Sequence, residues 1–395
     1  MAATADKARY FLEQSVPELQ ELQRKKIFSP AEIRSIAKRR SDFEHKINAP
    51  GPSPSDYAQY AEFEINVDQL RRKRVKRLGV KTTVRAGQRR VFFVFDRGNR
   101  KFPGDLGLWM QAIEYARAQK AYKKVEAMLT SVIRLHPTKV ELWIYAAGFA
   151  VEENGDMTQA RGYLQRGLRF CKNKKEIWLQ DFKLEVGWIA KIHARRQILG
   201  IEQNALKEDV RVVGQSESTT DVTSVDLEGA LLDDDEQTQD KVDVDAIQNL
   251  DNTPVLSGAI PIAIFDAAML QFDNDSTLAF SFFEAARAIG DLPPIRKILQ
   301  HIHATMSSTR PNMFSTIAMS ITLTVHGISA SDPKFPAALR DMLRALSTGF
   351  DAVDSKQRGL LSAWCRKFLE ELTTEDMDDD LKLILNSKTA SLAAS

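Results

Sequence analysis

Residues 137–168 read PTKVELWIYAAGFAVEENGDMTQARGYLQRGL, and this stretch decides the fold. Trp143 and Phe149 are six residues apart, with an alanine midway, so they share one face of a first helix. A second helix is expected over Ala160–Leu168, where small and apolar residues lie on one side and charges on the other. The stretch therefore predicts a pair of amphipathic helices that must bury an apolar face.

The pair recurs with a period of about 34 residues. Trp109, Trp143 and Trp178 are 34 and 35 residues apart, and Pro103 and Pro137 are also 34 apart. Apolar pairs at 94–95, 128–129 and 163–164 keep the same spacing in the second helices. An earlier unit begins at an aromatic helix near residue 57. Stacked helix pairs bury such aromatics as a core rather than as a cofactor site. The predicted repeat core comprises Tyr57, Tyr60, Phe63, Trp109, Trp143, Phe149 and Trp178.

The repeat resumes near Ile264-Phe265 and Ile298-Leu299, again 34 residues apart, and looser helical stretches follow. We therefore predict an all-α protein, an α-α superhelix (solenoid) of helical repeats with an acidic disordered insertion. The expected parts are an N-terminal helical region (1–54), a repeat block (55–200), an acidic flexible linker (201–255) and C-terminal repeats (256–395).

The motif Trp-x-x-aromatic-x-x-apolar-Glu, followed by Ala-Arg-x-apolar-apolar-x-Arg, resembles the half-a-tetratricopeptide (HAT) repeat. The best matches are residues 57–64 and 160–168, while Ala116 and Ala150 replace the usual glutamate. The N-terminal residues Tyr10-Phe11-Leu12-Glu13, Arg39-Arg40-Ser41-Asp42-Phe43-Glu44 and Leu70–Arg74 are similar to the U3 small nucleolar RNA-associated protein 6 family. That resemblance implies a nucleolar subunit of the small-subunit processome, in its UTP-B subcomplex with β-propeller proteins, associated with U3 RNA and needed for pre-18S ribosomal RNA processing.

A basic insertion or helix extension occupies residues 71–90, which hold ten Lys or Arg and no acidic residue. Neighbours in sequence cannot balance these cations, so an external anion is expected. RNA phosphates, a nuclear localisation receptor or an acidic protein are the candidates. The block contains no aromatic residue, which disfavours base stacking. The candidate contacts are Arg71, Arg72, Lys73, Arg74, Lys76, Arg77, Lys81, Arg85, Arg89 and Arg90.

An acidic block follows the first repeats. Residues 201–251 hold fifteen Asp or Glu against three Lys or Arg, with the densest run at Asp233–Glu236. Low hydrophobicity with charge of one sign predicts a flexible segment rather than a metal site.

No enzyme signature is present. The sequence lacks a phosphate loop, a dinucleotide fingerprint, a His-Glu-x-x-His motif and a Gly-x-Ser-x-Gly elbow. His301 and His303 would point about 200° apart on a helix, so they cannot share a metal. We therefore expect a protein that is not an enzyme, with no catalytic residue, metal, cofactor, small-molecule substrate or membrane partner. The two cysteines, far apart, fit a reducing compartment, and residues 1–14 lack the apolar run of a secretion signal. We expect a nuclear, nucleolar protein.

Three alternatives stay open at this point. The chain could be a HAT scaffold of pre-mRNA splicing or 3′-end processing, an RNA-binding protein acting through the basic segment, or a chaperone-type tetratricopeptide adaptor. Retained introns, tight RNA binding by the purified protein and binding of short peptide tails would distinguish them.

Overall fold

The computed structural model describes residues 9–80, 86–198, 257–329 and 332–372, together with 381–383, 385 and 387. Every helix or strand element in these ranges is an α-helix, as predicted. The helices form two compact units, residues 1–170 and 171–395. The acidic residues 201–251 lie outside the described residues, so their flexibility stays a prediction, as do the domain bounds predicted from the sequence.

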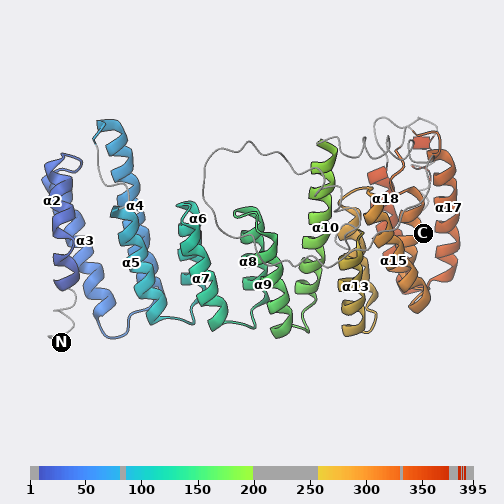
Figure 1. Cartoon of the computed structure of the whole chain (residues 1–395), viewed down its shortest axis with the longest axis horizontal. Helices are drawn as coiled ribbons and strands as arrows, with labels where there is room; N and C mark the ends of the chain where they lie inside the picture. Colours follow the sequence, from blue (N-terminus) through green and yellow to red (C-terminus); the bar gives the residue numbers. More distant parts are fainter. Residues whose placement is uncertain are drawn as a thin grey trace, which may run out of the picture. The chain divides into compact units, whose positions relative to one another are not determined.

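The first unit is a series of helices in which chain neighbours pack together. Helix α4 packs on α5, α6 on α7 and α8 on α9, so each predicted repeat is one helix pair (Figure 1). The bounds are α2 Val16–Arg24, α3 Pro30–Asn48, α4 Pro54–Leu78, α5 Ala86–Lys101, α6 Leu106–Ala118, α7 Tyr122–Leu135, α8 Val140–Glu152 and α9 Met157–Phe170.

Short polar residues set the helix ends. Ser29 and Glu32 form a reciprocal capping box at the start of α3, which satisfies two amides that would otherwise lack partners. Asp105 accepts a hydrogen bond from the Leu108 amide (2.9 Å) at the start of α6. Helix α4 ends at Gly79, whose φ of 64° is in the left-handed region that glycine adopts without a steric penalty.

The repeating tryptophans make a repeating hydrogen bond. Each indole Nε1 donates to the carbonyl oxygen six residues earlier, in the turn before its own helix. This bond satisfies the one polar atom of an otherwise apolar side chain, and its acceptor is always six residues before the tryptophan. The pairs are Trp109 with Pro103 (3.2 Å), Trp143 with Pro137 (2.9 Å) and Trp178 with Lys172 (3.0 Å).

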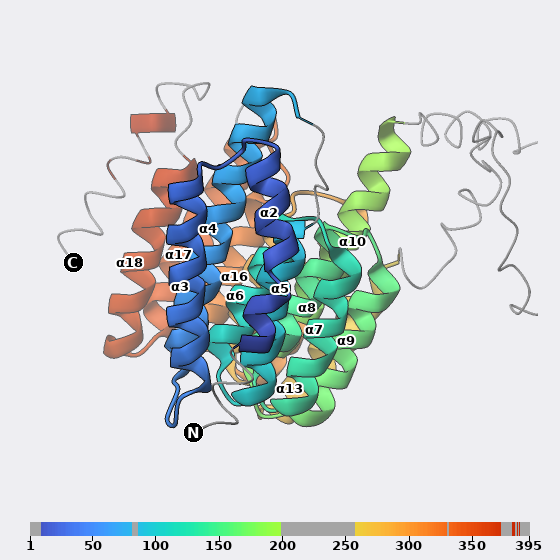
Figure 2. The same cartoon turned by 90° about the vertical axis from the view of Figure 1, so that its left-hand side faces the viewer.

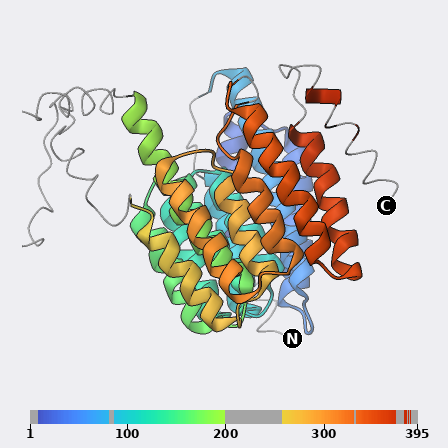
Figure 3. The ribbon, with the colours of Figure 1, turned by 90° about the vertical axis from the view of Figure 1, so that its right-hand side faces the viewer.

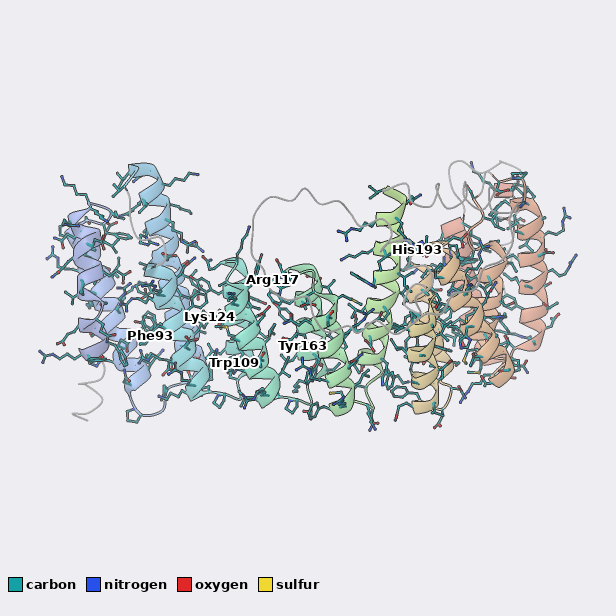
Figure 4. All side chains as sticks on the ribbon, in the orientation of Figure 1. Phe93, Trp109, Arg117, Lys124, Tyr163 and His193 are labelled. Atoms are coloured by element: carbon teal, nitrogen blue, oxygen red, sulfur yellow. The ribbon has the colours of Figure 1, made fainter. Side chains whose placement is uncertain are left out.

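The predicted repeat core is buried at most positions. Tyr57, Tyr60, Trp109, Trp143 and Phe149 are each no more than 9% exposed, whereas the other two are partly buried at the edge of the core. Those two are Phe63, whose ring lies beside that of Phe43, and Trp178. Trp109 is among the side chains labelled in Figure 4.

The second unit continues the pairing across a long insertion. Helix α10 packs on α13, although residues 199–258 separate them in sequence. Phe182, Phe265 and Phe282 are fully buried where α10, α13 and α14 meet. The acidic segment therefore enters the chain between the two helices of one packed pair. The bounds are α10 Lys175–Ile198, α13 Ala259–Gln271, α14 Ser276–Arg287, α15 Pro293–Thr309, α16 Phe314–Val325, α17 Phe335–Ala352 and α18 Ser355–Leu372 (Figure 3).

Candidate functional site at the basic end of helix α4

The basic segment is an extension of helix α4. Residues 71–78 form its last two turns, and Arg89 and Arg90 lie in the first turns of α5. Figures 1 and 2 show the end of α4 projecting beyond its neighbours in the first unit. Lys81 and Arg85 lie outside the described residues.

Two of the arginines share one carboxylate within α4 itself. One carboxylate, that of Asp68, accepts from Arg71 (Nε 2.9 Å, Nη2 2.7 Å) and from Arg72 (Nη2 2.7 Å). Asp68 and Arg71 are almost completely buried. Arg72 also donates to the Gln119 side chain (2.7 Å), at the end of α6. Arg72 therefore joins α4 to the neighbouring repeat.

A third arginine joins α4 to the turn between α2 and α3. Arg74 forms two parallel bonds to the Glu32 carboxylate (2.8 and 2.7 Å), donates to the Ile27 carbonyl (3.1 Å) and lies over the Phe28 ring, 4.8 Å from its centroid. The hydrogen bond from Arg74 and the amide of Ser29 lower the pKa of Glu32 to about 2.

Arg90 belongs to a buried network of charges. Its Nε lies 3.4 Å from Glu18, which is also 3.9 Å from Nη1 of Arg40. Arg40 in turn forms a two-pronged pair with Glu64 (2.7 and 2.8 Å), and the two side chains are only 2–3% exposed. The network connects α2, α3, α4 and α5. A buried guanidinium has no neutral form available, so each carboxylate is required.

The other four described cations of the basic segment differ from these arginines in exposure and pairing. They are exposed and have no hydrogen bond or ion pair among the described residues. Lys73, Lys76 and Arg77 follow the spacing i, i+3, i+4, which places them on one face of the projecting end of α4. Arg89 is the fourth member of this set. We call Lys73, Lys76, Arg77 and Arg89 the free basic set.

The expectation that all ten cations need an external anion is therefore wrong for Arg71, Arg72, Arg74 and Arg90. Their counter-charges come from helix positions that sequence proximity alone does not reveal, apart from Asp68. An open cavity of about 750 Å³ lies between the α2–α3 turn and the end of α4, and Arg77 is the member of the free basic set that lines it. Lys26, Phe28, Arg77 and Leu78 are among its lining residues.

The two histidines that lie close together in sequence, His301 and His303, do not form a shared site. His301 binds the Asp266 carboxylate (2.8 Å) whereas His303 contacts the Ser307 hydroxyl (3.2 Å), so the two rings have different partners. No group of three His, Cys, Asp or Glu side chains in these ranges is placed to hold a metal ion. None of the helices described is both long and apolar enough to cross a bilayer.

Comparison with known proteins finds similarity to one family. Residues 12–92 match the family model for U3 small nucleolar RNA-associated protein 6. The Schizosaccharomyces pombe protein of that name is 38% identical over 226 residues, 56% of this chain and 46% of the relative. The first part of this chain is thus similar to U3 small nucleolar RNA-associated protein 6. The family homologues of Mus musculus and Homo sapiens are 30% and 28% identical over 190 and 193 residues, each 47% of this chain and 32% of the relative.

The buried network lies inside the matched segment. Residues 12–92 include Glu18, Arg40, Glu64 and Arg90, so the part of the chain that is similar to the family model also contains the ion pairs joining α2 to α5. The aligned region spans less than half of each of these relatives.

Proposed function

We propose that this chain is a non-catalytic scaffold in the U3-containing small-subunit processome, with a role in processing the 18S ribosomal RNA precursor in the nucleolus. Its family relatives carry the name of U3 small nucleolar RNA. The observation that carries the proposal is the packing of successive helix pairs, each burying an aromatic that recurs every 34 residues. Such pairs, stacked as an α-α superhelix, offer extended surfaces for protein partners.

The proposed partners are the β-propeller and other protein subunits of UTP-B. We expect stable co-purification with them, and the association should survive nuclease treatment because the contacts are between proteins. Loss of these subunits after nuclease treatment would mean that RNA, and not this chain, holds them together.

Depletion of the protein tests the function. We expect loss of 18S ribosomal RNA and accumulation of its uncut precursor, with the large-subunit RNA spared. Normal 18S levels with retained introns would favour a splicing scaffold instead. Measuring ribosomal and messenger RNA in the same depleted cells separates the two.

The free basic set supports a second role, direct contact with RNA phosphates. Three exposed cations on the projecting end of α4 and a fourth, Arg89, in the first turns of α5 have no counter-charge among the described residues and suit a non-sequence-specific phosphate contact. If each engages one phosphate of a single strand, the slope of log K against log salt should be about −3.

Charge reversal at the free basic set tests that role. Lys73→Glu, Lys76→Glu, Arg77→Glu and Arg89→Glu together should flatten the slope and leave the helix content unchanged. Reversal of the paired arginines is the contrasting variant, because it should unfold the α2–α5 region instead. If reversal at the free basic set changes nuclear import and leaves RNA crosslinking intact, the segment is a localisation signal.

A further inference from the structure

The first unit has a second cavity, and its lining includes two carboxylates, those of Glu62 and Glu114. The cavity, of about 500 Å³, is formed by α4 and α6 with Phe95 of α5 behind them. Its size is in the range of pockets that hold small ligands or side chains. We call it the α4–α6 groove. Its lining residues are Ser55, Ala58, Gln59, Glu62, Ile65, Phe95, Gln111, Glu114, Tyr115 and Ala118.

The groove is lined in two parallel rows. Gln59 and Glu62 are three residues apart on α4, and Gln111 and Glu114 are three apart on α6, so each amide lies one turn from a carboxylate. All four side chains are exposed and none has a hydrogen bond or ion pair among the described residues. The groove thus carries two negative charges without an internal counter-charge.

The residues of an ion pair in the next repeat are replaced here by smaller ones. Between α6 and α8, Arg117 donates to Glu152 (2.9 Å) and to Glu153 (2.8 Å). Counted from the first-helix aromatic of each unit, the positions of Arg117 and Glu152 correspond to Ile65 and Ala118. Both of these smaller residues line the groove. Two smaller residues therefore replace the Arg117–Glu152 pair at the preceding interface, where Arg72 donates to Gln119 instead.

The groove combines apolar residues with two carboxylates, a combination that suits a lysine or arginine side chain. The methylene stem of lysine or arginine packs on apolar surface while its cationic head reaches polar groups. Here Ile65 and Phe95 offer the apolar surface, and Glu62 and Glu114 offer the counter-charge. Tyr115 also lines the groove, but its hydroxyl is enclosed by protein. The polar groups that the two rows of the groove offer to a ligand are therefore those of Gln59, Glu62, Gln111 and Glu114.

We propose that the α4–α6 groove binds an extended segment of a partner protein through lysine or arginine side chains placed between Glu62 and Glu114. The amides of Gln59 and Gln111 would hydrogen-bond the backbone of that segment. This site deepens the scaffold role and rests on it. The binding assay below uses purified protein, so its failure leaves the ribosomal RNA phenotype untouched, and the reverse also holds.

The direct test uses a fluorescent, acetylated peptide of sequence Ala-Arg-Ala-Ala-Arg-Ala and the full-length protein. Fluorescence anisotropy should show saturable binding that weakens as salt rises, because the charges are exposed. The combined variant Glu62→Gln with Glu114→Gln should weaken binding about tenfold, since two partly exposed ion pairs are lost. A peptide with glutamine in place of both arginines should not bind.

Two matched variants separate the groove from general charge. Asp42→Asn with Glu141→Gln removes two exposed carboxylates outside the groove and should leave the affinity unchanged. Ile65→Arg with Ala118→Glu rebuilds the ion pair of the next repeat, keeps the net charge and should block binding by filling the groove. Circular dichroism and the thermal midpoint establish that each variant is folded.

A photo-crosslinkable version of the peptide locates the site. Crosslinks should fall on α4 and α6 and disappear in the Ile65→Arg, Ala118→Glu variant. Equal affinity for the protein and its Glu62→Gln, Glu114→Gln variant would overturn the proposal. Crosslinks confined to the acidic residues 201–251 would also overturn it, because the peptide would then be responding to charge alone.

Discussion

The buried pair between Arg40 and Glu64 offers the most demanding prediction. Glu64→Gln keeps the shape of the side chain and removes its charge. The Arg40 guanidinium, 2% exposed, then remains charged with only Glu18 nearby, at 3.9 Å from Nη1. Removing one partner of a buried ion pair costs about 3–5 kcal/mol of unfolding free energy.

The same geometry predicts that removing both partners is far less harmful. Arg40→Met with Glu64→Met replaces two buried charges by apolar side chains of similar length. Such replacements are often neutral or stabilise by about 1–4 kcal/mol. A double variant much more stable than Glu64→Gln would place the cost in the unpaired charge and not in lost packing.

Urea denaturation of the full-length protein measures these changes, and hydrogen exchange locates them. Faster exchange should be confined to the amides of α3, α4 and α5. Glu13→Gln is the control, because Glu13 pairs with Arg9 at side chains that are 63% and 80% exposed; its cost should be below about 1 kcal/mol. A loss of less than about 1 kcal/mol for Glu64→Gln would refute the reasoning, since water would then be reaching the guanidinium.

Three further outcomes are expected. Trp143→Ala should cost about 3–5 kcal/mol, because the indole is 4% exposed and stacks on a neighbouring ring; a loss near zero in urea would contradict its place in the core. Burial raises the pKa of the Cys365 thiol to about 12, so Cys365 should resist a thiol reagent at pH 8 until the protein is unfolded, and rapid labelling of the native protein would contradict this. The lowered pKa of Glu32 means that its pairing with Arg74 stabilises the fold above the ordinary carboxyl pKa near 4.5 and is lost as pH falls toward 2. Glu32→Gln should therefore make stability less dependent on pH between 4.5 and 2, as acid titration monitored by circular dichroism would measure.

The pairing of helices could be predicted from the sequence because its signals are periodic. Trp109 and Trp143 each follow a proline by six residues, and in the structure each indole donates a hydrogen bond to that proline's carbonyl. Such a period can be recognised in the sequence alone, because it does not depend on which distant residues are in contact.

The behaviour of the basic segment could be predicted only in part. Asp68 is three residues before Arg71, so their ion pair could have been expected from helix spacing. The partner of Arg74 is Glu32, 42 residues away, and depends on how α3 meets α4. A run of like charges in a sequence therefore does not say which members are buried.

The α4–α6 groove was missed for a related reason. Glu62 and Glu114 look like ordinary surface residues in the sequence. Ile65 and Ala118 line the groove and are smaller than Arg117 and Glu152, the residues at the corresponding positions of the next repeat. The sequence holds one signal for this difference. When the units are aligned on their first aromatic residue, Ile65 and Ala118 stand where the next unit has Arg117 and Glu152.

The direct packing of α10 on α13 has a consequence for how this chain can vary in length. Because the two helices pack together, the ends of the 60-residue connection are held by the fold whatever the connection contains. The entropy of closing a flexible connection grows with the logarithm of its length, so extending one from four to 60 residues adds only about 2–3 kcal/mol. Residues can thus be gained or lost at this point without repacking Phe182 against Phe282. Among relatives, chain length should vary most in the connection between α10 and α13, while the aromatic spacing on either side of it stays constant.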